Sequence, residues 1–365
     1  MTAPAQHAPA QGLDRSDLIL LGGTAAAIVA AALTHFVGGG DILAFLASAV
    51  AVTLLAAVVG RSVEQLGDRF GPSATGVLQS ALGNLPELFI ALFALKAGLV
   101  AVVQAALIGS ILANLMLVLG LSFVVGGLRH GTQHINSARA QHIGVMLFVS
   151  VAAMVMPSVA AFIHSPAEPH ENTLSVIASV ILIALFALSL PASLRRDEGS
   201  HESDVSAHHE PPRWPLAMAI GLLAGSGLAA AFVSDWFVTA LEPAMKTLGI
   251  SEAFAGLVIV AIAGNAIENV VGIQLAAKGQ SEYAFAVVIN SPLQIALVLA
   301  PLLVILSNLL GFATLTLVFS PLLVAAVLLA VILSVLITFD GHSNWLEGAA
   351  LIGLYGVVAA TFWWG

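Results

Sequence analysis

The chain contains no cysteine, so neither disulfide bonds nor thiolate chemistry can contribute to its stability or activity. Charge is also scarce, because only 8% of the 365 residues are charged, whereas a soluble domain carries about 25%. So few charges cannot cover the surface of a globular protein in water. The composition therefore excludes an ordinary soluble domain, and nothing in it indicates a nucleic-acid partner.

Hydrophobic residues make up 59% of the chain, and the mean hydropathy is +1.02. Uncharged runs recur along the whole sequence, and about 20 helical residues are enough to cross a hydrocarbon layer of about 30 Å. The strict alternation expected of a membrane β-barrel is absent. The sequence therefore predicts an all-α polytopic protein whose main partner is the lipid bilayer.

Eleven transmembrane helices are predicted, and the seventh is long, with Asp235 as the place for any break. They lie near residues 17–37, 41–60, 72–96, 99–127, 141–163, 173–194, 215–245, 251–277, 282–308, 314–339 and 345–364. Residues 1–16 lack the basic start and apolar core of a cleavable signal, so we expect no removed leader.

The placement of lysine and arginine predicts the orientation, since cytoplasmic loops carry an excess of these residues. With the N-terminus inside, nine of them fall in inside loops: Arg15, Arg61, Arg69, Arg129, Arg139, Arg195, Arg196, Arg213 and Lys278. Only Lys96 and Lys246 fall outside. We therefore expect a multi-pass protein of the cell inner (plasma) membrane, with its N-terminus cytoplasmic and its C-terminus outside.

An internal repeat relates the two halves of the chain. Residues 83–120 begin GNLPE and residues 264–301 begin GNAIE, and the ungapped match continues from Gly98 to Gly279 and from Ser110 to Ser291. Each copy then contains five helices, and an odd number of crossings inverts the second copy relative to the first. Inverted repeats with a site near the midplane are typical of secondary transporters.

This repeat divides the chain into four parts. They are a tail with the first helix at 1–40, a first five-helix repeat at 41–194, an acidic, His-rich cytoplasmic linker at 195–214, and a second five-helix repeat at 215–365. A mobile tether and a pH-sensing or cation-gathering segment are both compatible with the linker's composition.

Glu87 and Glu268 lie deep in predicted spans and at equivalent repeat positions. Because an ionisable side chain costs several kcal/mol at the bilayer centre, each indicates a functional site, although a protonated glutamate that only joins helices is the alternative. The Gly-Asn pairs that precede them, Gly83–Asn84 and Gly264–Asn265, should interrupt the helices and expose carbonyl groups. Pro86 favours the same break in the first copy.

Polar side chains on the following helix of each copy can face the same region. Ser110, Ser291 and Gln294 are the candidates, with Asn114 nearby, and each alone is also compatible with a packing role. Gln79, two turns before Glu87, can line the same path. Carboxylate, amide and carbonyl oxygens are the ligands of hard cations such as Ca²⁺.

Two facing carboxylates also indicate a mechanism. Without a cation between them they repel and bind protons, and with a divalent cation they release those protons. Proton and cation therefore compete for one site, and alternating access turns that competition into exchange. No resident cofactor is needed.

The two glutamate motifs, the run IGSILANLMLVLGLSFVVGGL and the segment NSPLQIALVLAP resemble the two repeats of the calcium/proton exchanger (CAX) family of the calcium/cation antiporter superfamily. The resemblance covers nearly everything after residue 60. It implies a fold of one plus five plus five helices and cation-binding roles for Glu87 and Glu268. The ligand positions implied around them are Gly83, Asn84, Gly264, Asn265, Ser110, Ser291 and Gln294.

The chain departs from the family pattern at Leu85 and Pro86, where GNATE is usual, and around Glu268 and Ser291. Both glutamates are present, so we expect a secondary antiporter that exports Ca²⁺ in exchange for H⁺. A Na⁺(K⁺)/H⁺ antiporter of the same fold is the alternative, followed by a passive cation channel. The chain has neither HExxH nor GxSxG, so we do not expect an enzyme. The sequence leaves open whether the chain forms a homo-oligomer.

Overall fold

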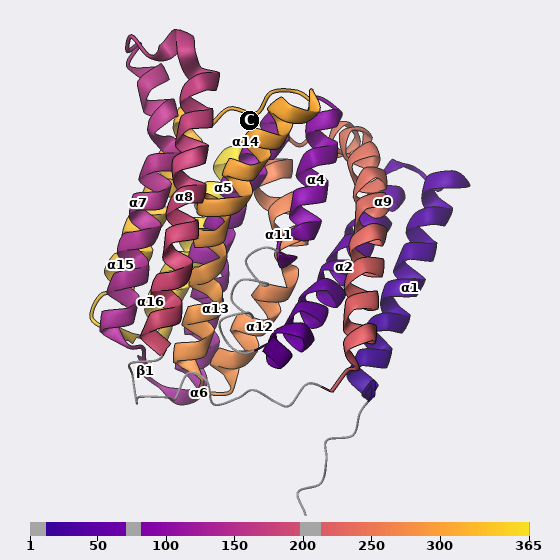
Figure 1. Cartoon of the computed structure of the whole chain (residues 1–365), viewed down its shortest axis with the longest axis horizontal. Coiled ribbons are helices and arrows are strands. Elements are labelled where there is room, and N and C mark those ends of the chain that lie inside the picture. Colours follow the sequence, from indigo (N-terminus) through magenta and orange to yellow (C-terminus); the bar gives the residue numbers. More distant parts are fainter. Residues whose placement is uncertain (1–11, 71–81, 198–212, 365) are drawn as a thin grey trace, which may run out of the picture.

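The protein is a bundle of long helices in a computed structural model (Figure 1). The structure describes residues 12–70, 82–197 and 213–364, without the side chains of residues 68, 70, 190–197 and 266–268. The first half contains α1 (Arg15–Phe36), α2 (Asp41–Phe70), α4 (Leu85–Lys96), α5 (Val100–Leu112), η1 (Ala113–Val118), α6 (Leu119–His130), β1 (Gln133–His134), α7 (Ser137–Phe162), η2 (Glu168–His170) and α8 (Glu171–Asp197). The second half contains α9 (Leu216–Leu248), α10 (Glu252–Phe254), η3 (Ala255–Val260), α11 (Ala261–Gly264), α12 (Ala266–Ala277), α13 (Ser281–Gln294), η4 (Ile295–Leu299), α14 (Ala300–Leu310), α15 (Pro321–Thr338), β2 (His342–Ser343) and α16 (Trp345–Trp363).

The predicted polytopic α-helical class is confirmed. Within the described residues, nine helices are long and apolar enough to cross a membrane, and a tenth span results if the bent pair Glu252–Gly264 and Asn269–Ala277 is one crossing. The predicted third span, 72–96, falls partly on residues 71–81, which lie outside the described part, and α4 is its described portion. The total of eleven therefore stays a prediction.

Three predicted spans differ from the structure. The second was predicted to end near residue 60, whereas α2 continues to Phe70. α9 is one continuous helix that passes through Asp235 without a break. α15 begins at Pro321 rather than near residue 314, because the preceding segment is not helical and side chains of other helices accept hydrogen bonds from its backbone. The N–H of Leu317 donates to Ser175 Oγ and the N–H of Phe319 to Ser158 Oγ, each at 2.9 Å. Because these buried backbone N–H groups already have hydrogen-bond acceptors, the segment does not have to be helical to pair them.

The backbone repeats the local geometry that the sequence repeat predicts. Asn84 (φ −94°, ψ 20°) and Asn265 (φ −95°, ψ 14°) have nearly the same non-helical conformation at the start of α4 and α12. Gly98 (φ 83°) and Gly279 (φ 77°) both occupy the left-handed region, which favours glycine. In Figure 1, α4 runs from the centre to the upper end and α12 from the centre to the lower end. The two copies are therefore inverted relative to each other.

α1, α2 and α9 pack together along one side of the bundle (Figure 1). Their lower ends are joined by a polar cluster, here called the clasp, made of Asp14, Asp17, Arg61, Gln65, Arg213 and Trp214. Trp214 Nε1 donates to Asp17 Oδ2 at 2.9 Å, and Arg61 Nε donates to Asp17 Oδ1 at 3.3 Å. The N–H groups of Arg213 and Trp214 donate to Gln65 Oε1 at 2.8 and 3.0 Å.

The clasp is buried at its centre, where Asp17 and Trp214 are each only 1% exposed, whereas its charged side chains Asp14, Arg61 and Arg213 are partly exposed. The Arg213 guanidinium forms an ion pair with Asp14 Oδ2 at 2.6 Å, and the backbone carbonyl of Arg213 accepts a hydrogen bond from the N–H of Gly12 at 3.1 Å. The chain that leads into α9 is thus fixed to α2 and to the start of α1 by several hydrogen bonds of different kinds.

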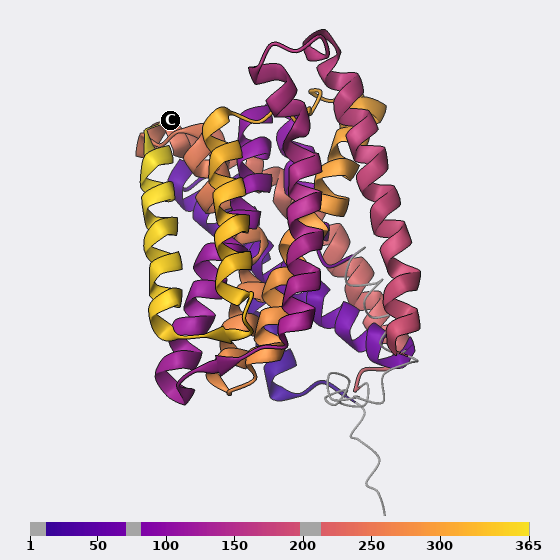
Figure 2. The ribbon, with the colours of Figure 1, turned by 90° about the vertical axis from the view of Figure 1, so that its left-hand side faces the viewer.

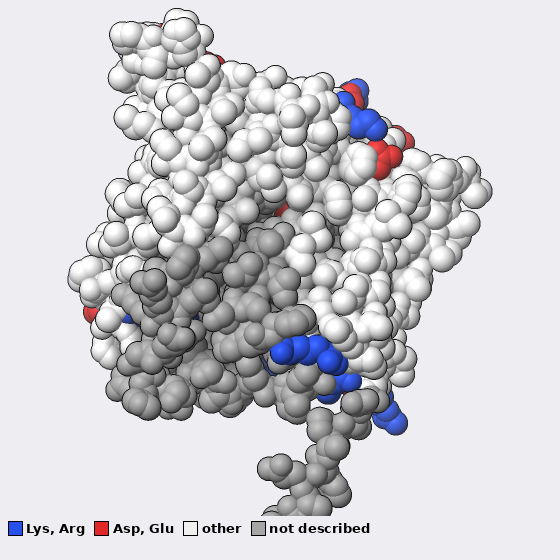
Figure 3. All heavy atoms as spheres, viewed as in Figure 1, with Lys and Arg blue, Asp and Glu red and all other residues white. Residues whose placement is uncertain are grey.

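The start of α1 and the end of α16 lie at opposite ends of the bundle (Figure 2). Lysine and arginine side chains gather at the lower end of the face in Figure 3, near the starts of α1 and α9, whereas charges of both signs meet at the upper end. There Lys246 Nζ pairs with Glu242 at 2.7 Å. This distribution agrees with the asymmetry on which the predicted orientation rests.

Candidate cation-binding site

Two interrupted helices bring the predicted site residues to the middle of the bundle. α12 begins directly after Gly264–Asn265, which end α11, and α4 begins directly after the turn at Gly83–Asn84, so both Gly-Asn pairs lie at a helix start, as predicted. In the second copy the helix axes on the two sides of the break differ by 61°. Irregular backbone at this depth is tolerated where it lines a polar site inside the protein.

Asn265 is the centre of a buried hydrogen-bond network that joins the two repeats. Its Nδ2 donates to Ser110 Oγ and to Ala261 O, each at 2.9 Å. Its Oδ1 accepts from Ser291 Oγ and from Asn114 Nδ2, each at 3.2 Å. The amide group therefore uses both of its protons and both lone pairs of its oxygen within the protein.

Asn84 occupies the equivalent backbone position but has far fewer partners. Its Nδ2 lies 3.5 Å from Gln294 Oε1, the limit of a hydrogen bond. Its Oδ1 is buried and has no hydrogen-bond partner among the described residues. A buried carbonyl oxygen without a donor is costly in the empty protein, and it is a suitable ligand for a cation.

Glu87 lies across the interface between the repeats. A Cβ placed on Gly264 would be 2.6 Å from Glu87 Cγ and 3.2 Å from its Cδ and Oε1, so the carboxyl group packs directly over this glycine. The first glutamate therefore rests on the helix break of the second repeat. Only glycine leaves room for it there.

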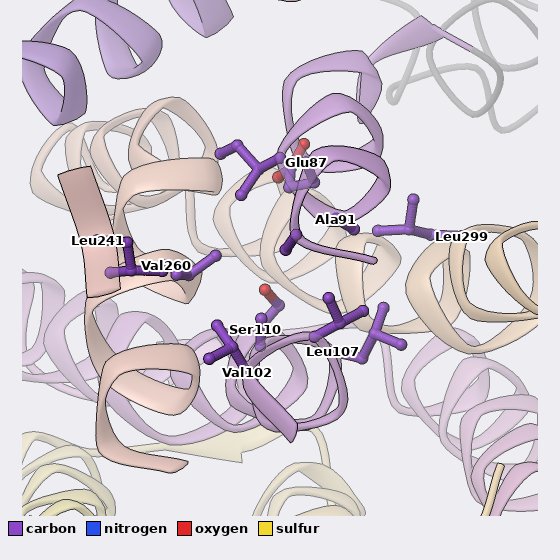
Figure 4. A pocket seen from close by; sticks show the side chains of 12 residues that line it. Glu87, Ala91, Val102, Leu107, Ser110, Leu241, Val260 and Leu299 are labelled. Atoms are coloured by element: carbon purple, nitrogen blue, oxygen red, sulfur yellow. The ribbon is translucent and has the colours of Figure 1, made fainter. Parts of the chain in front are cut away.

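A cavity of about 20 Å³ adjoins Glu87, which is room for about one water-sized occupant. In Figure 4 the Glu87 carboxylate from α4 and the Ser110 hydroxyl from α5 lie on this cavity, which is otherwise surrounded by apolar side chains such as Leu107 and Val260. Glu87 is only partly exposed, and a carboxylate beside so many apolar side chains is less well hydrated than one in bulk water. Its charge is therefore best balanced by a bound cation or a proton.

Not every predicted residue can be placed. Glu268 lies on α12, but its side chain is outside the described part of the structure, and Gln79 falls within residues 71–81, which are also outside it. The backbone places Gly83 at the first break. Of the nine candidates, the structure joins Asn84 to Gln294, Asn265 to Ser110 and Ser291, and Glu87 to Gly264.

Two residues have a larger part in the site than the sequence indicated. Asn114 is fully buried, and besides Asn265 its Nδ2 lies within 3.3 Å of Ser291 Oγ and 2.9 Å of Ser110 O. The sequence signal for Asn114 is its position four residues after Ser110, because residues i and i+4 lie on the same helix face. Thr53 on α2 donates to Ala263 O at 3.2 Å, beside the second break, and no sequence pattern pointed to it.

Comparisons with known proteins agree with this arrangement. The model of the family described as "Sodium/calcium exchanger protein" matches residues 41–194 and 218–364. The Ca(2+)/H(+) antiporter ChaA of Bacillus subtilis is 38% identical over 318 residues, which cover 86% of this chain and 90% of that protein. A Ca(2+)/H(+) antiporter of Synechocystis is 35% identical, with 90% and 92% of the two chains covered.

Solved structures show the same fold. The structure of native YfkE superposes with a TM-score of 0.80 at 32% identity and covers 94% of this chain and 99% of that one. The H⁺/Ca²⁺ exchanger CAX superposes with a TM-score of 0.75 at 16% identity, covering 95% of this chain and 92% of that one, which supports the fold alone. The resemblance inferred from the glutamate motifs is confirmed, and the chain belongs to the sodium/calcium exchanger protein family.

Proposed function

We propose that this protein is a secondary antiporter that exports Ca²⁺ in exchange for H⁺, a transporter and not an enzyme. The observation that carries the proposal is the position of Glu87, whose carboxyl group packs on the helix break at Gly264 of the inverted second repeat. A carboxylate shared between two inverted units can exchange its ligand with either side of the membrane when those units move relative to each other.

The transported Ca²⁺ would be bound by oxygen atoms from both repeats. Glu87 and Glu268 would supply the carboxylates, and the Oδ1 of Asn84, which has no donor among the described residues, would supply a neutral ligand. The backbone carbonyls of Gly83 and Gly264 and water molecules would complete the 6–8 ligands that Ca²⁺ prefers. Asn265, with its amide saturated, would hold Ser110 and Ser291 in place rather than bind the ion.

Exchange follows from competition for the same carboxylates. When Ca²⁺ leaves, the two glutamates can enter the apolar middle of the bundle only after proton binding removes their charge. Protons that bind from outside would thus be carried in and released when Ca²⁺ binds from the cytoplasm. We place the protein in the plasma membrane, with its N-terminus cytoplasmic and its C-terminus outside.

Cation-dependent proton flux in proteoliposomes tests this function. A pH gradient is imposed, and Ca²⁺, Na⁺ and K⁺ are added separately to the wild type, to Glu87→Gln and to Glu268→Gln. Glu242→Gln is the matched control, because Glu242 lies exposed at the end of α9 and pairs with Lys246. We expect Ca²⁺ to dissipate the gradient in the wild type and the control, and neither site variant to respond.

Each other outcome has a distinct meaning. If Na⁺ or K⁺ alone dissipates the gradient, the protein is a Na⁺(K⁺)/H⁺ antiporter and the proposed substrate is wrong. If a cation moves through the protein without moving protons, the passive channel is the correct function. If the two site variants transport like the wild type, the glutamates do not bind the exchanged ions.

A further inference from the structure

A short two-stranded ribbon joins one loop of each repeat at the lower end of the bundle. β1 lies between α6 and α7, β2 lies between α15 and α16, and the two strands pair antiparallel with Gln133 opposite Ser343 and His134 opposite His342. The next opposed pair continues the ladder, because the N–H of Ile135 donates to Gly341 O at 2.8 Å. Hydrogen-bonded and non-hydrogen-bonded pairs alternate in such a ladder, so His134 and His342 form a non-hydrogen-bonded pair.

This register brings the two imidazole rings together. The side chains of a non-hydrogen-bonded pair lie closer together than those of a hydrogen-bonded pair. Directly opposed residues also point to the same face of a ribbon. The ring centroids of His134 and His342 are 4.9 Å apart, with their planes at 85°, and both residues are exposed.

The opposite face of the ribbon is anchored in the protein. Gln133 and Ser343 are only 3% and 2% exposed, and Gln133 Nε2 donates to Phe123 O at 3.0 Å. The backbone is therefore held from one side while both histidines are presented to solvent on the other. A pair held in this way loses little conformational freedom when it binds a ligand.

The separation of the rings suits a shared metal ion. A tetrahedral ion bonded to two imidazole nitrogens at about 2.0–2.1 Å holds the ring centres about 5 Å apart. Asp340 adds negative charge nearby, and its Oδ1 accepts from the N–H of His342 at 2.9 Å. Imidazole selects Zn²⁺, Ni²⁺ and Cu²⁺, whereas Ca²⁺ and Mg²⁺ prefer oxygen ligands.

We propose that His134 and His342 bind one divalent transition-metal ion of the Zn²⁺, Ni²⁺ and Cu²⁺ class. In the described part of the chain, no three histidine, aspartate or glutamate side chains are grouped so as to hold a metal ion. The site therefore supplies two protein ligands and leaves its other positions to water, which makes binding reversible. The bound ion would link a loop of the first repeat to a loop of the second, away from the transport site.

Zn²⁺ titration of the purified full chain in detergent, against a chromophoric competitor, measures the site directly. His201, His208 and His209 are replaced by asparagine throughout, because these linker histidines can also bind Zn²⁺. His134→Asn and His342→Asn are each compared with His142→Asn, an exposed histidine at the same end of the bundle. We expect one equivalent of Zn²⁺ bound in the micromolar range, with at least about tenfold weaker binding in either pair variant and no change in the control.

The absence of cysteine from the chain allows an independent test of the geometry. The double variant His134→Cys, His342→Cys should form an intramolecular disulfide under mild oxidation, because the Cα atoms of a non-hydrogen-bonded pair lie about 4.5 Å apart, within the range that a disulfide spans. Failure to form it would show that the two loops are not paired and would overturn the proposal. A disulfide together with unchanged Zn²⁺ binding in both asparagine variants would overturn it as well.

Discussion

Replacing Gly264 by alanine tests whether the Glu87 carboxyl group must rest on the second helix break. The new Cβ would lie 2.6 Å from Glu87 Cγ, and ordinary contact begins at 3.4 Å, so the side chain must move by about 0.8 Å. Overpacking of this size costs about 1–3 kcal/mol. A displacement of about 1 Å in a group that acts on its ligand can reduce activity by about 100-fold.

The assay is Ca²⁺-driven proton flux in proteoliposomes, together with thermal unfolding in detergent. The matched control is Gly272→Ala on α12, the helix that follows the break, whose Cβ would meet Val288 Cγ2 at 2.5 Å, a clash of similar size with an apolar side chain. We expect both variants to lose similar stability, but only Gly264→Ala to lose about 10- to 100-fold in transport at limiting Ca²⁺. Equal transport by the two variants would refute the contact between Glu87 and the break.

Three further predictions concern the amide groups of the site and the clasp. Asn265→Ala should lower the free energy of unfolding by about 2–4 kcal/mol, because it removes four buried hydrogen bonds. Asn84→Ala should leave thermal unfolding nearly unchanged and should instead raise the Ca²⁺ concentration needed for half-maximal flux. The opposite pattern would reverse the roles assigned to these residues. Trp214→Phe should destabilise the protein by about 1.5–3 kcal/mol through loss of the hydrogen bond to the Asp17 carboxylate, as measured by denaturation beside a variant at an exposed tryptophan. The N–H of Asp17, the Ser16 hydroxyl and Arg213 hold the pKa of Asp14 well below its usual value of 3.8. The Asp14 carboxylate therefore stabilises the fold above pH 3.8, and this stabilisation is lost as the pH falls below 3.8. The difference in unfolding free energy between the wild type and Asp14→Asn should shrink between pH 6 and pH 3. A constant difference would contradict this account.

The membrane class, the repeat and the two helix breaks could be predicted because each depends on local composition or on a motif that occurs twice. The Gly-Asn pair occurs at equivalent positions of the two copies, and Asn84 and Asn265 have almost the same backbone angles. Gly98 and Gly279, which match in the repeat, also share a positive φ, although the match alone did not predict it.

The inequivalence of the two asparagines depends on what faces them, and a motif does not contain that information. The ungapped match that pairs Ser110 with Ser291 places Ile295 opposite Asn114, so only one copy supplies an amide at this point. This amide binds Asn265 and leaves the oxygen of Asn84 without a comparable donor. The start of α15 could not be predicted either, because a non-helical segment that donates hydrogen bonds to distant serines has the same apolar composition as a helix.

The clasp has a consequence for the continuity of the chain. The residues leading into α9 are held by Asp14, Asp17 and Gln65 through hydrogen bonds and an ion pair, and α9 itself packs along α2. The covalent connection between residues 197 and 213 is therefore not what keeps the two halves together. Two separately synthesised fragments that end and begin there should recognise each other in the membrane and assemble into one working transporter.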